Sequence, residues 1–155
     1  WLTSIGGYTS WTNFSDKRFK NDIQENVPGL EFILKLKPVT YHLNIAMINK
    51  SLGQEYNQDD AIRSGKENIV YTGFLAQDVE QAAKEIGFDF SGVDKPKNEN
   101  GFYGLRYAEF TVPLVKAVQE LHLKNIELQQ TIDNQNIKIF DLQKQIDELK
   151  NLINK

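Results

Sequence analysis

"LVKAVQELHLKNIELQQTIDNQNIKIFDLQKQIDELKNLI", residues 114–153, is the stretch that decides most of the fold. Its hydrophobic residues recur at alternating spacings of four and three, which is the heptad pattern of a coiled coil. The d positions begin at Leu114 and the a positions at Val118. The predicted coiled-coil core consists of Leu114, Val118, Leu121, Asn125, Leu128, Ile132, Gln135, Ile139, Leu142, Ile146, Leu149 and Ile153.

One long helix with so narrow an apolar stripe would leave that stripe in water. Because the remaining sequence offers no second helix of comparable length, we expect the chain to associate with copies of itself in a parallel coiled coil. Ile at a with Leu at d favours two strands, whereas the polar core residues Asn125 and Gln135 fix register and oligomer state. Taken alone, the heptad therefore leans weakly towards a dimer. A DNA-binding zipper is excluded, since the residues before the heptad form no basic region.

The sequence upstream of Pro113 mixes helical and strand patterns without regular repeats, which predicts an α+β fold: a small mixed globular domain followed by the long helix. We expect helices between Pro28 and Pro38 and from Ala76 to Ile86, the second capped by Gly87. Strands are predicted within 39–44, 69–75 (buried) and 103–107, a mobile polar surface excursion over 45–68, a loop over 88–102, and a helix from Ala108 or Glu109 onwards.

Composition excludes several classes of function. The chain has 155 residues, a net charge of −3 and no cysteine, so disulfides, thiolate metal sites and a cysteine nucleophile are excluded. No long basic block favours nucleic acid, and no apolar run approaches the roughly 20 residues that cross a bilayer. The chain begins at Trp1 with neither methionine nor a charged leader, so we expect it to be the C-terminal part of a longer polypeptide. The cellular compartment stays open.

One short segment, "TNFSDKRFKNDI" (residues 12–23), carries the candidate chemistry in Ser15, Asp16 and Lys20. A neutral lysine can take the proton of a serine hydroxyl, provided that burial lowers the lysine pKa well below about 10.4. In a helix, positions 15 and 20 point about 140° apart, and in a strand they lie on opposite faces, so a dyad requires a turn between them. Composition alone favours the simpler interpretation, in which Ser15 or Asp16 caps a short helix and the neighbouring cations are solvated.

The other candidate sites are weaker. His42 and His122 are the only histidines and neither has a second ligand at metal spacing, so no metal site and no cofactor are predicted. Asp78 and Glu80 do not face each other on a helix, and Asp78 suits the helix dipole. A ligand-binding module would rest only on the aromatic residues of "WLTSIGGYTSW", which are more typical of packing.

Four blocks in a fixed order resemble the peptidase S74 family: "SDKRFKNDI", "LEFILKLKPVTYHLN", "YTGFLAQDVEQ" and "YGLRYAEFTVPLVKAVQELHLKNIELQ". Members of this family are C-terminal intramolecular chaperones of endosialidases and phage tailspikes, and they also occur in bacterial surface proteins and in the myelin regulatory factor of animals. The blocks "ENVPGLEFI", "AAKEIGFDFSGVD" and "NENGFYGLRYAEF" are most similar to versions from Bacteroidetes-type secreted or cell-surface proteins.

The resemblance implies a homotrimer that assists folding of an upstream passenger region of the same polypeptide, on a phage virion or a cell surface. It also implies autoproteolysis, with Ser15 as nucleophile, Lys20 as general base, Asp16 in support and the peptide bond between Phe14 and Ser15 as the one cleaved. The implied organisation is a connector over 1–14, a chaperone domain over 15–112 and a coiled coil over 113–155. The implied trimer overrides the weak dimer preference of the heptad.

Two functions from different classes remain open at this point. The first is a self-cleaving trimerisation chaperone, a serine peptidase that acts once on its own chain. The second is a structural trimeric cap of a surface fibre or adhesin that does not cleave, in which "SDKRF" is only a turn.

Overall fold

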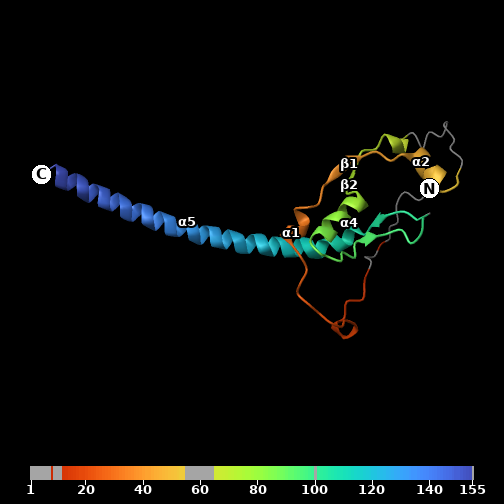
Figure 1. Ribbon diagram of the computed structural model, residues 1–155, viewed down its shortest axis with the longest axis horizontal. Helices are drawn as coiled ribbons and strands as arrows, with labels where there is room; N and C mark the ends of the chain where they lie inside the picture. The colour runs from red at the N-terminus through yellow and green to blue at the C-terminus, as the bar shows by residue number, and fades with distance from the viewer. Residues whose placement is uncertain (1–7, 9–11, 55–64, 100, 155) are drawn as a thin grey trace.

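The computed structural model describes residues 8, 12–54, 65–99 and 101–154. A small body of short helices and strands gathers at one end of a long helix, and a loop hangs from the body (Figure 1). The elements are η1 (Lys17–Phe19), α1 (Leu30–Ile33), β1 (Val39–Tyr41), α2 (Ile45–Ser51), β2 (Tyr71–Gly73), α4 (Ala76–Glu85), β3 (Val93–Asp94), β4 (Gly104–Leu105), η2 (Tyr107–Phe110) and α5 (Thr111–Ile153). The predicted small mixed domain followed by a long C-terminal helix is confirmed. A single chain carries no information on the predicted trimeric coiled coil.

Helix α4 supplies the body with its main apolar face. Val79, Ala82 and Ala83 follow helical spacing and are buried, because the three side chains share one side of the helix. The helix ends where Gly87 adopts a φ of +66°, a left-handed conformation that glycine takes at little cost. The prediction of this helix and of its capping glycine is confirmed.

Aromatic rings fill the space between α4, α1 and the start of α5. Phe32 is completely buried, with its ring centroid 4.9 Å from that of Phe90. Phe90 in turn lies 4.8 Å from Phe110, so the rings join α1, the segment after α4 and η2 in one cluster. Burying a phenylalanine contributes roughly 1.5–3 kcal/mol, so these rings are a large part of what holds so small a body together.

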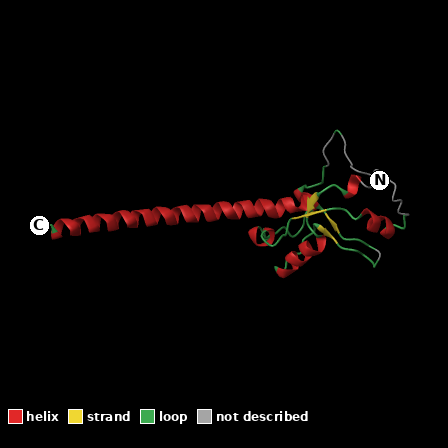
Figure 2. Ribbon diagram, turned by 90° about the horizontal axis from the view of Figure 1, so that it is seen from above, coloured by secondary structure: helices red, strands yellow, loops and turns green. Residues whose placement is uncertain are grey.

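Two antiparallel strand pairs flank the core instead of forming one sheet (Figure 2). In the first, Val39 of β1 pairs with Gly73 of β2. The strand predicted within 69–75 is present but is not buried, since Ile69 and Val70 are exposed. In the second, β3 pairs with β4, so the prediction of a loop over 88–102 missed a strand. Strands of two residues carry no alternation to read from sequence.

Two further expectations were wrong in extent. Helix α1 stops at Ile33 because the chain then tightens into i to i+3 turns, with Leu36 N donating to Ile33 O at 3.3 Å before Pro38. The predicted surface excursion over 45–68 begins instead with α2, which Asn44 caps by accepting from Met47 N and which buries Ile45. Residues 55–64 lie outside the described residues, as does most of the predicted connector over 1–14.

Helix α5 has 43 residues and is about 65 Å long, at about 1.5 Å per residue. Pro113 lies in its first turn, where a missing N–H breaks no hydrogen bond, and it is buried together with Ala117. Every residue from 121 to 154 is exposed; we call 121–153 the stalk. Among the described residues, no helix is both long and apolar enough to span a membrane.

Candidate active site

The segment that carries the candidate chemistry is a loop that leaves the body, which we call the arm (residues 12–26). Every arm residue is exposed except Asp16, which is half-buried. Figure 1 shows the arm hanging away from both the body and α5. Three exposed apolar side chains lie on it, those of Phe14, Phe19 and Ile23.

A single turn of 3-10 helix, η1, shapes the middle of the arm. Asp16 is its N-cap, and its carboxylate accepts hydrogen bonds from the backbone N of Arg18 at 2.9 Å and from the Arg18 side chain at 2.7 Å. The turn is closed by Lys20 N, which donates to Lys17 O at 3.1 Å. The side-chain and backbone hydrogen bonds from Arg18 hold the pKa of the Asp16 carboxyl below its usual value, so Asp16 stays ionised and accepts only.

This turn brings Ser15 and Lys20 together. Lys20 Nζ donates a hydrogen bond to Ser15 Oγ at 2.8 Å across the five-residue interval. Regular helix or strand would have kept these side chains apart, so η1 supplies the turn that the sequence showed to be necessary. The separation lies within the 2.6–3.2 Å reach that a general base requires. Both side chains are exposed in the single chain.

The root of the arm is fixed by a contact that sequence reasoning did not anticipate. Leu30 N, at the start of α1, donates to Glu120 Oε2 of α5 at 2.7 Å. Gly29 lies so close that a Cβ there would stand 2.7 Å from Ala117 N and from Glu120 Oε2. The contact joins residues 90 positions apart, so no local pattern could have indicated it. The chain that follows the arm is therefore held against α5 at Gly29 and Leu30, which we call the root of the arm.

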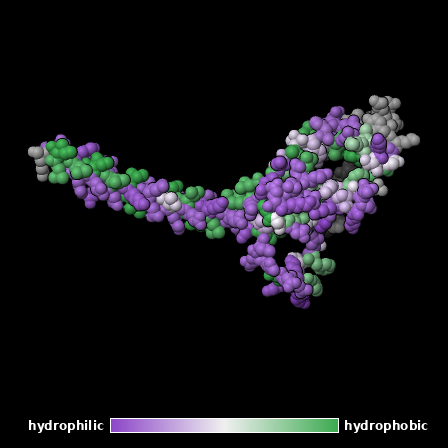
Figure 3. All heavy atoms as spheres, viewed as in Figure 1, coloured by the Kyte–Doolittle hydropathy of each residue, from purple (hydrophilic) through white to green (hydrophobic). Residues whose placement is uncertain are grey.

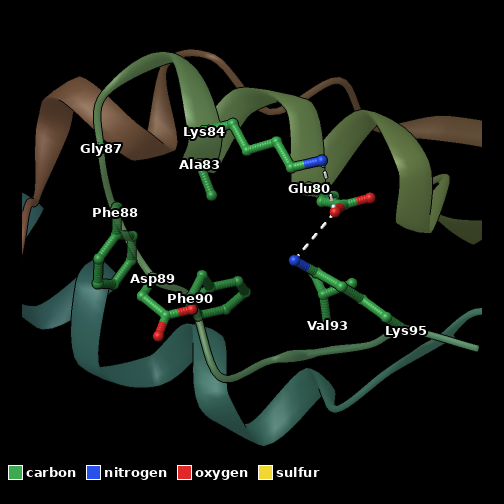
Figure 4. A pocket seen from close by; sticks show the side chains of 9 residues that line it. All are labelled: Glu80, Ala83, Lys84, Gly87, Phe88, Asp89, Phe90, Val93 and Lys95. Carbon is green, nitrogen blue, oxygen red and sulfur yellow. Dashed lines mark ion pairs between the residues drawn. The ribbon is translucent and has the colours of Figure 1, made fainter. Parts of the chain in front are cut away.

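A second ionic cluster, centred on Glu80 of α4, is structural. Glu80 accepts from Lys84 at 2.7 Å, from Lys95 at 3.0 Å and from the Tyr103 hydroxyl at 2.9 Å. Figure 4 shows Lys84 and Lys95 approaching the carboxylate from opposite sides. The Lys84 hydrogen bond above all, followed by those from Lys95 and Tyr103, lowers the pKa of Glu80 from 4.5 to about 2. This cluster ties α4 to the segment of β3 and β4.

The remaining candidates from the sequence do not converge. His42 and His122 are both exposed, and Asp78 lies in the first turn of α4, where its charge suits the helix dipole. Within the described part of the chain, no group of three histidine, aspartate or glutamate side chains is arranged to hold a metal ion.

Comparison with known protein families assigns the segment that begins at the candidate nucleophile. Residues 15–88 match the model of the peptidase S74 family, described as chaperone of endosialidase. No curated protein and no solved structure matches the chain. The matched segment starts at Ser15 and runs through α4, so it includes η1, both members of the serine and lysine pair, and the helix that forms the core. The match confirms, over residues 15–88, the resemblance of the sequence blocks to the peptidase S74 family, the chaperone of endosialidase.

Proposed function

We propose that this chain is a C-terminal intramolecular chaperone that trimerises through α5, assists the folding of an upstream region of its own polypeptide, and then cuts the peptide bond between Phe14 and Ser15. The family assignment supports the chaperone role. The observation that carries the cleavage is the 2.8 Å hydrogen bond between Lys20 Nζ and Ser15 Oγ. In this scheme residues 1–14 end the passenger side, 15–112 form the chaperone domain and 113–155 form the coiled coil.

The apolar stripe of α5 supports the trimer. Its hydrophobic a and d residues are between 46% and 82% exposed in the single chain, from Leu114 to Ile153. Burying each of these side chains in a coiled coil would contribute roughly 1.5–3 kcal/mol, so their sum strongly favours association. Asn125 and Gln135 would form polar layers that fix the register. The choice of three strands over two rests on the family.

The proposed reaction is an intramolecular acyl shift followed by hydrolysis. Neutral Lys20 accepts the hydroxyl proton of Ser15 while Oγ attacks the carbonyl carbon of Phe14, closing a five-membered ring of Oγ, Cβ, Cα, N and the carbonyl carbon. Lys20 then returns the proton to the Ser15 nitrogen as the C–N bond breaks, which leaves an ester between Phe14 and Ser15 Oγ. Water hydrolyses that ester, so the products are a carboxylate at Phe14 and a free amine and hydroxyl at Ser15. Because nucleophile and carbonyl are neighbours in the chain, orientation supplies much of the rate.

Association would complete this site. Lys20 must be neutral to act as a base, and removal from water is the means by which proteins favour a neutral lysine. In the single chain both Lys20 and Ser15 are exposed, so the surface that covers them has to come from another chain or from the passenger. Cleavage would in this way follow assembly.

A second candidate function is a trimeric cap that never cleaves. The observation that favours it is that the side chains of Ser15 and Lys20 are exposed. In addition, the Asp16 carboxylate already forms an ion pair with Arg18. In that case η1 would be no more than a capped turn at the surface.

A denaturing gel of the full-length polypeptide separates the two candidates. We expect two bands from the native sequence and one band from Ser15→Ala and from Lys20→Arg, since arginine keeps the charge but cannot act as a base. The control is Lys17→Arg, which makes the same substitution at a neighbouring cation outside the pair, keeps its charge and should leave two bands. A single uncut band from the native sequence, in a preparation that is trimeric, would favour the cap.

A further inference from the structure

Besides Leu152 at a g position, four apolar side chains lie on the stalk outside the a and d positions. They occupy b and f positions and are between 43% and 71% exposed. They form two pairs 14 residues, or about 21 Å, apart, which follow one side of the helix. We call them the outer stripe: Leu123, Ile126, Ile137 and Phe140. Figure 3 shows hydrophobic residues recurring among polar ones along the stalk.

Assembly through the a and d positions would not cover the outer stripe. In a parallel coiled coil the b and f positions face away from the shared core. A solvated stalk needs polar residues there, so four exposed hydrophobic residues on this side call for a second contact surface.

The arm carries exposed aromatic rings and cations, which complement the apolar and acidic residues on the outer side of α5. Phe14 and Phe19 are 96% and 72% exposed, and the cations Lys17 and Arg18 lie between them. The b, c and f positions of α5 between residues 119 and 141 carry four acids and neither lysine nor arginine. These acids are Glu120, Glu127, Asp133 and Asp141. Two cations and one acid, Asp16, lie between the two rings, while Asp22 and Glu25 lie further along the arm, so the aromatic tip of the arm complements an acidic helix side with apolar pairs.

The arm can also reach the outer stripe. Its root at Gly29 lies against Glu120, and Ile126 is six residues, or about 9 Å, further along α5. Ten residues separate Gly29 from Phe19, enough for about 33 Å of extended chain. Phe140 lies about 30 Å along α5 from Glu120, which is close to the longest distance that the extended arm can span.

We propose that the arm of one chain docks on the outer stripe of a neighbouring copy in the oligomer. In the single chain the arm lies off its own helix, so its own outer stripe is not where it rests (Figure 1). The body packs on the side of α5 that carries Pro113 and Ala117, positions c and g. In a parallel coiled coil the g side of one helix adjoins the e side of the next, so each body overhangs the e and b side of its neighbour. The inference rests on the proposed self-association.

Disulfide trapping tests the docking cleanly, because the chain has no cysteine. Full-length chains carrying Phe19→Cys would be folded together with chains carrying Ile126→Cys and then mildly oxidised. We expect covalent dimers on a non-reducing denaturing gel. The distance control pairs Phe19→Cys with Asn151→Cys, an f position about 46 Å from Glu120 and beyond the reach of the arm. Chains with Phe19→Cys alone control for contact between arms.

Charge reversal adds a second readout. Glu127→Lys with Asp133→Lys in the Ile126→Cys chain should lower the yield of dimer about five-fold, the effect of losing two modest ion pairs. Equal yields from Asn151→Cys or from Phe19→Cys alone would overturn the proposal. A chain that carries both Phe19→Cys and Ile126→Cys tests whether the arm docks on its own helix. A disulfide within that chain, with none between mixed chains, would show that the arm docks on its own helix and would overturn the choice of a neighbouring copy. Light scattering on the same samples keeps the two proposals apart: a monomer contradicts the proposed function, whereas a trimer without cross-links contradicts only the docking.

Discussion

The body and the stalk place their hydrophobic residues in opposite environments. In the body, Phe32 and Val79 are almost completely withdrawn from water, and the rings of Phe90 and Phe110 close around them. In the stalk, leucine and isoleucine side chains are exposed along the whole helix. The body can therefore fold from its own contacts, while the stalk is suited to contacts with other chains. The arm resembles the stalk in this respect, which is why we attribute assembly and cleavage to the two extensions and folding to the body.

The largest expected effect follows from placing charge inside the stalk. Leu128→Asp with Ile132→Asp should abolish association, because adjacent d and a layers of a coiled coil cannot bury a cluster of carboxylates. Light scattering should report a monomer, and cleavage of the full-length polypeptide should stop. The matched control, Gln130→Asp with Asn134→Asp, adds the same charge at outer positions and should remain assembled. Efficient cleavage by the monomer would break the link between assembly and the site.

Point substitution separates association from folding better than truncation does. Removal of residues 114–155 would also remove Ala117 and Glu120, which pack against α1 and the root of the arm. A truncated chain could then lose cleavage only because its body is destabilised.

The next largest effect lies in the body. Phe32→Ala should lower the free energy of unfolding by about 3–5 kcal/mol, since it leaves a cavity among Phe88, Phe90 and Val79. Phe19→Ala removes the same atoms from the exposed arm. With both variants made in the monomeric Leu128→Asp, Ile132→Asp background, where no neighbouring stalk is present, Phe19→Ala should change the free energy of unfolding by less than about 0.5 kcal/mol. Urea denaturation of both variants measures the difference. Equal losses would contradict the division between body and arm.

A smaller effect is expected where the body meets α5. Glu120→Ala removes the acceptor of Leu30 N and should destabilise the body by about 1–3 kcal/mol. Glu127→Ala, one heptad further along and fully outside the body, should have almost no effect on the unfolding of the body. If the two variants unfold alike, the root of the arm is not held by Glu120.

The smallest effect concerns the Glu80 cluster. Because its pKa is lowered from 4.5 to about 2, the carboxylate stabilises the fold fully above about pH 4.5, and this contribution is lost as the pH falls towards 2. Glu80→Gln should lower the melting temperature by a few degrees at pH 7. The difference between the two proteins should shrink between pH 4.5 and pH 2. A difference that stays constant over this range would assign the stabilisation to packing instead of charge.

Repeating local patterns were the part of the fold that sequence could predict. The heptad of α5 and the apolar face of α4 each recur over several turns, and both helices are present. The pairing of β3 with β4 and the contact of α1 with Glu120 join segments that are distant in the sequence, so local patterns missed them. The early end of α1 and the Asn44 cap of α2 are local features that extend over too few residues to form a repeating pattern. The pairing of Ser15 with Lys20 could be predicted from the sequence only in part. Spacing showed only that a turn was required, and the order of the family blocks was what identified the pair as a candidate dyad.

The most direct test of the proposed function is the mass of the C-terminal fragment from the full-length polypeptide. We expect a trimeric product whose first residue is Ser15, with a free amine and no loss of atoms, and we expect no such fragment from Ser15→Ala or Lys20→Arg. A fragment that begins at any other residue, or a trimeric native protein that stays whole when Ser15 and Lys20 are both present, would contradict the proposed function.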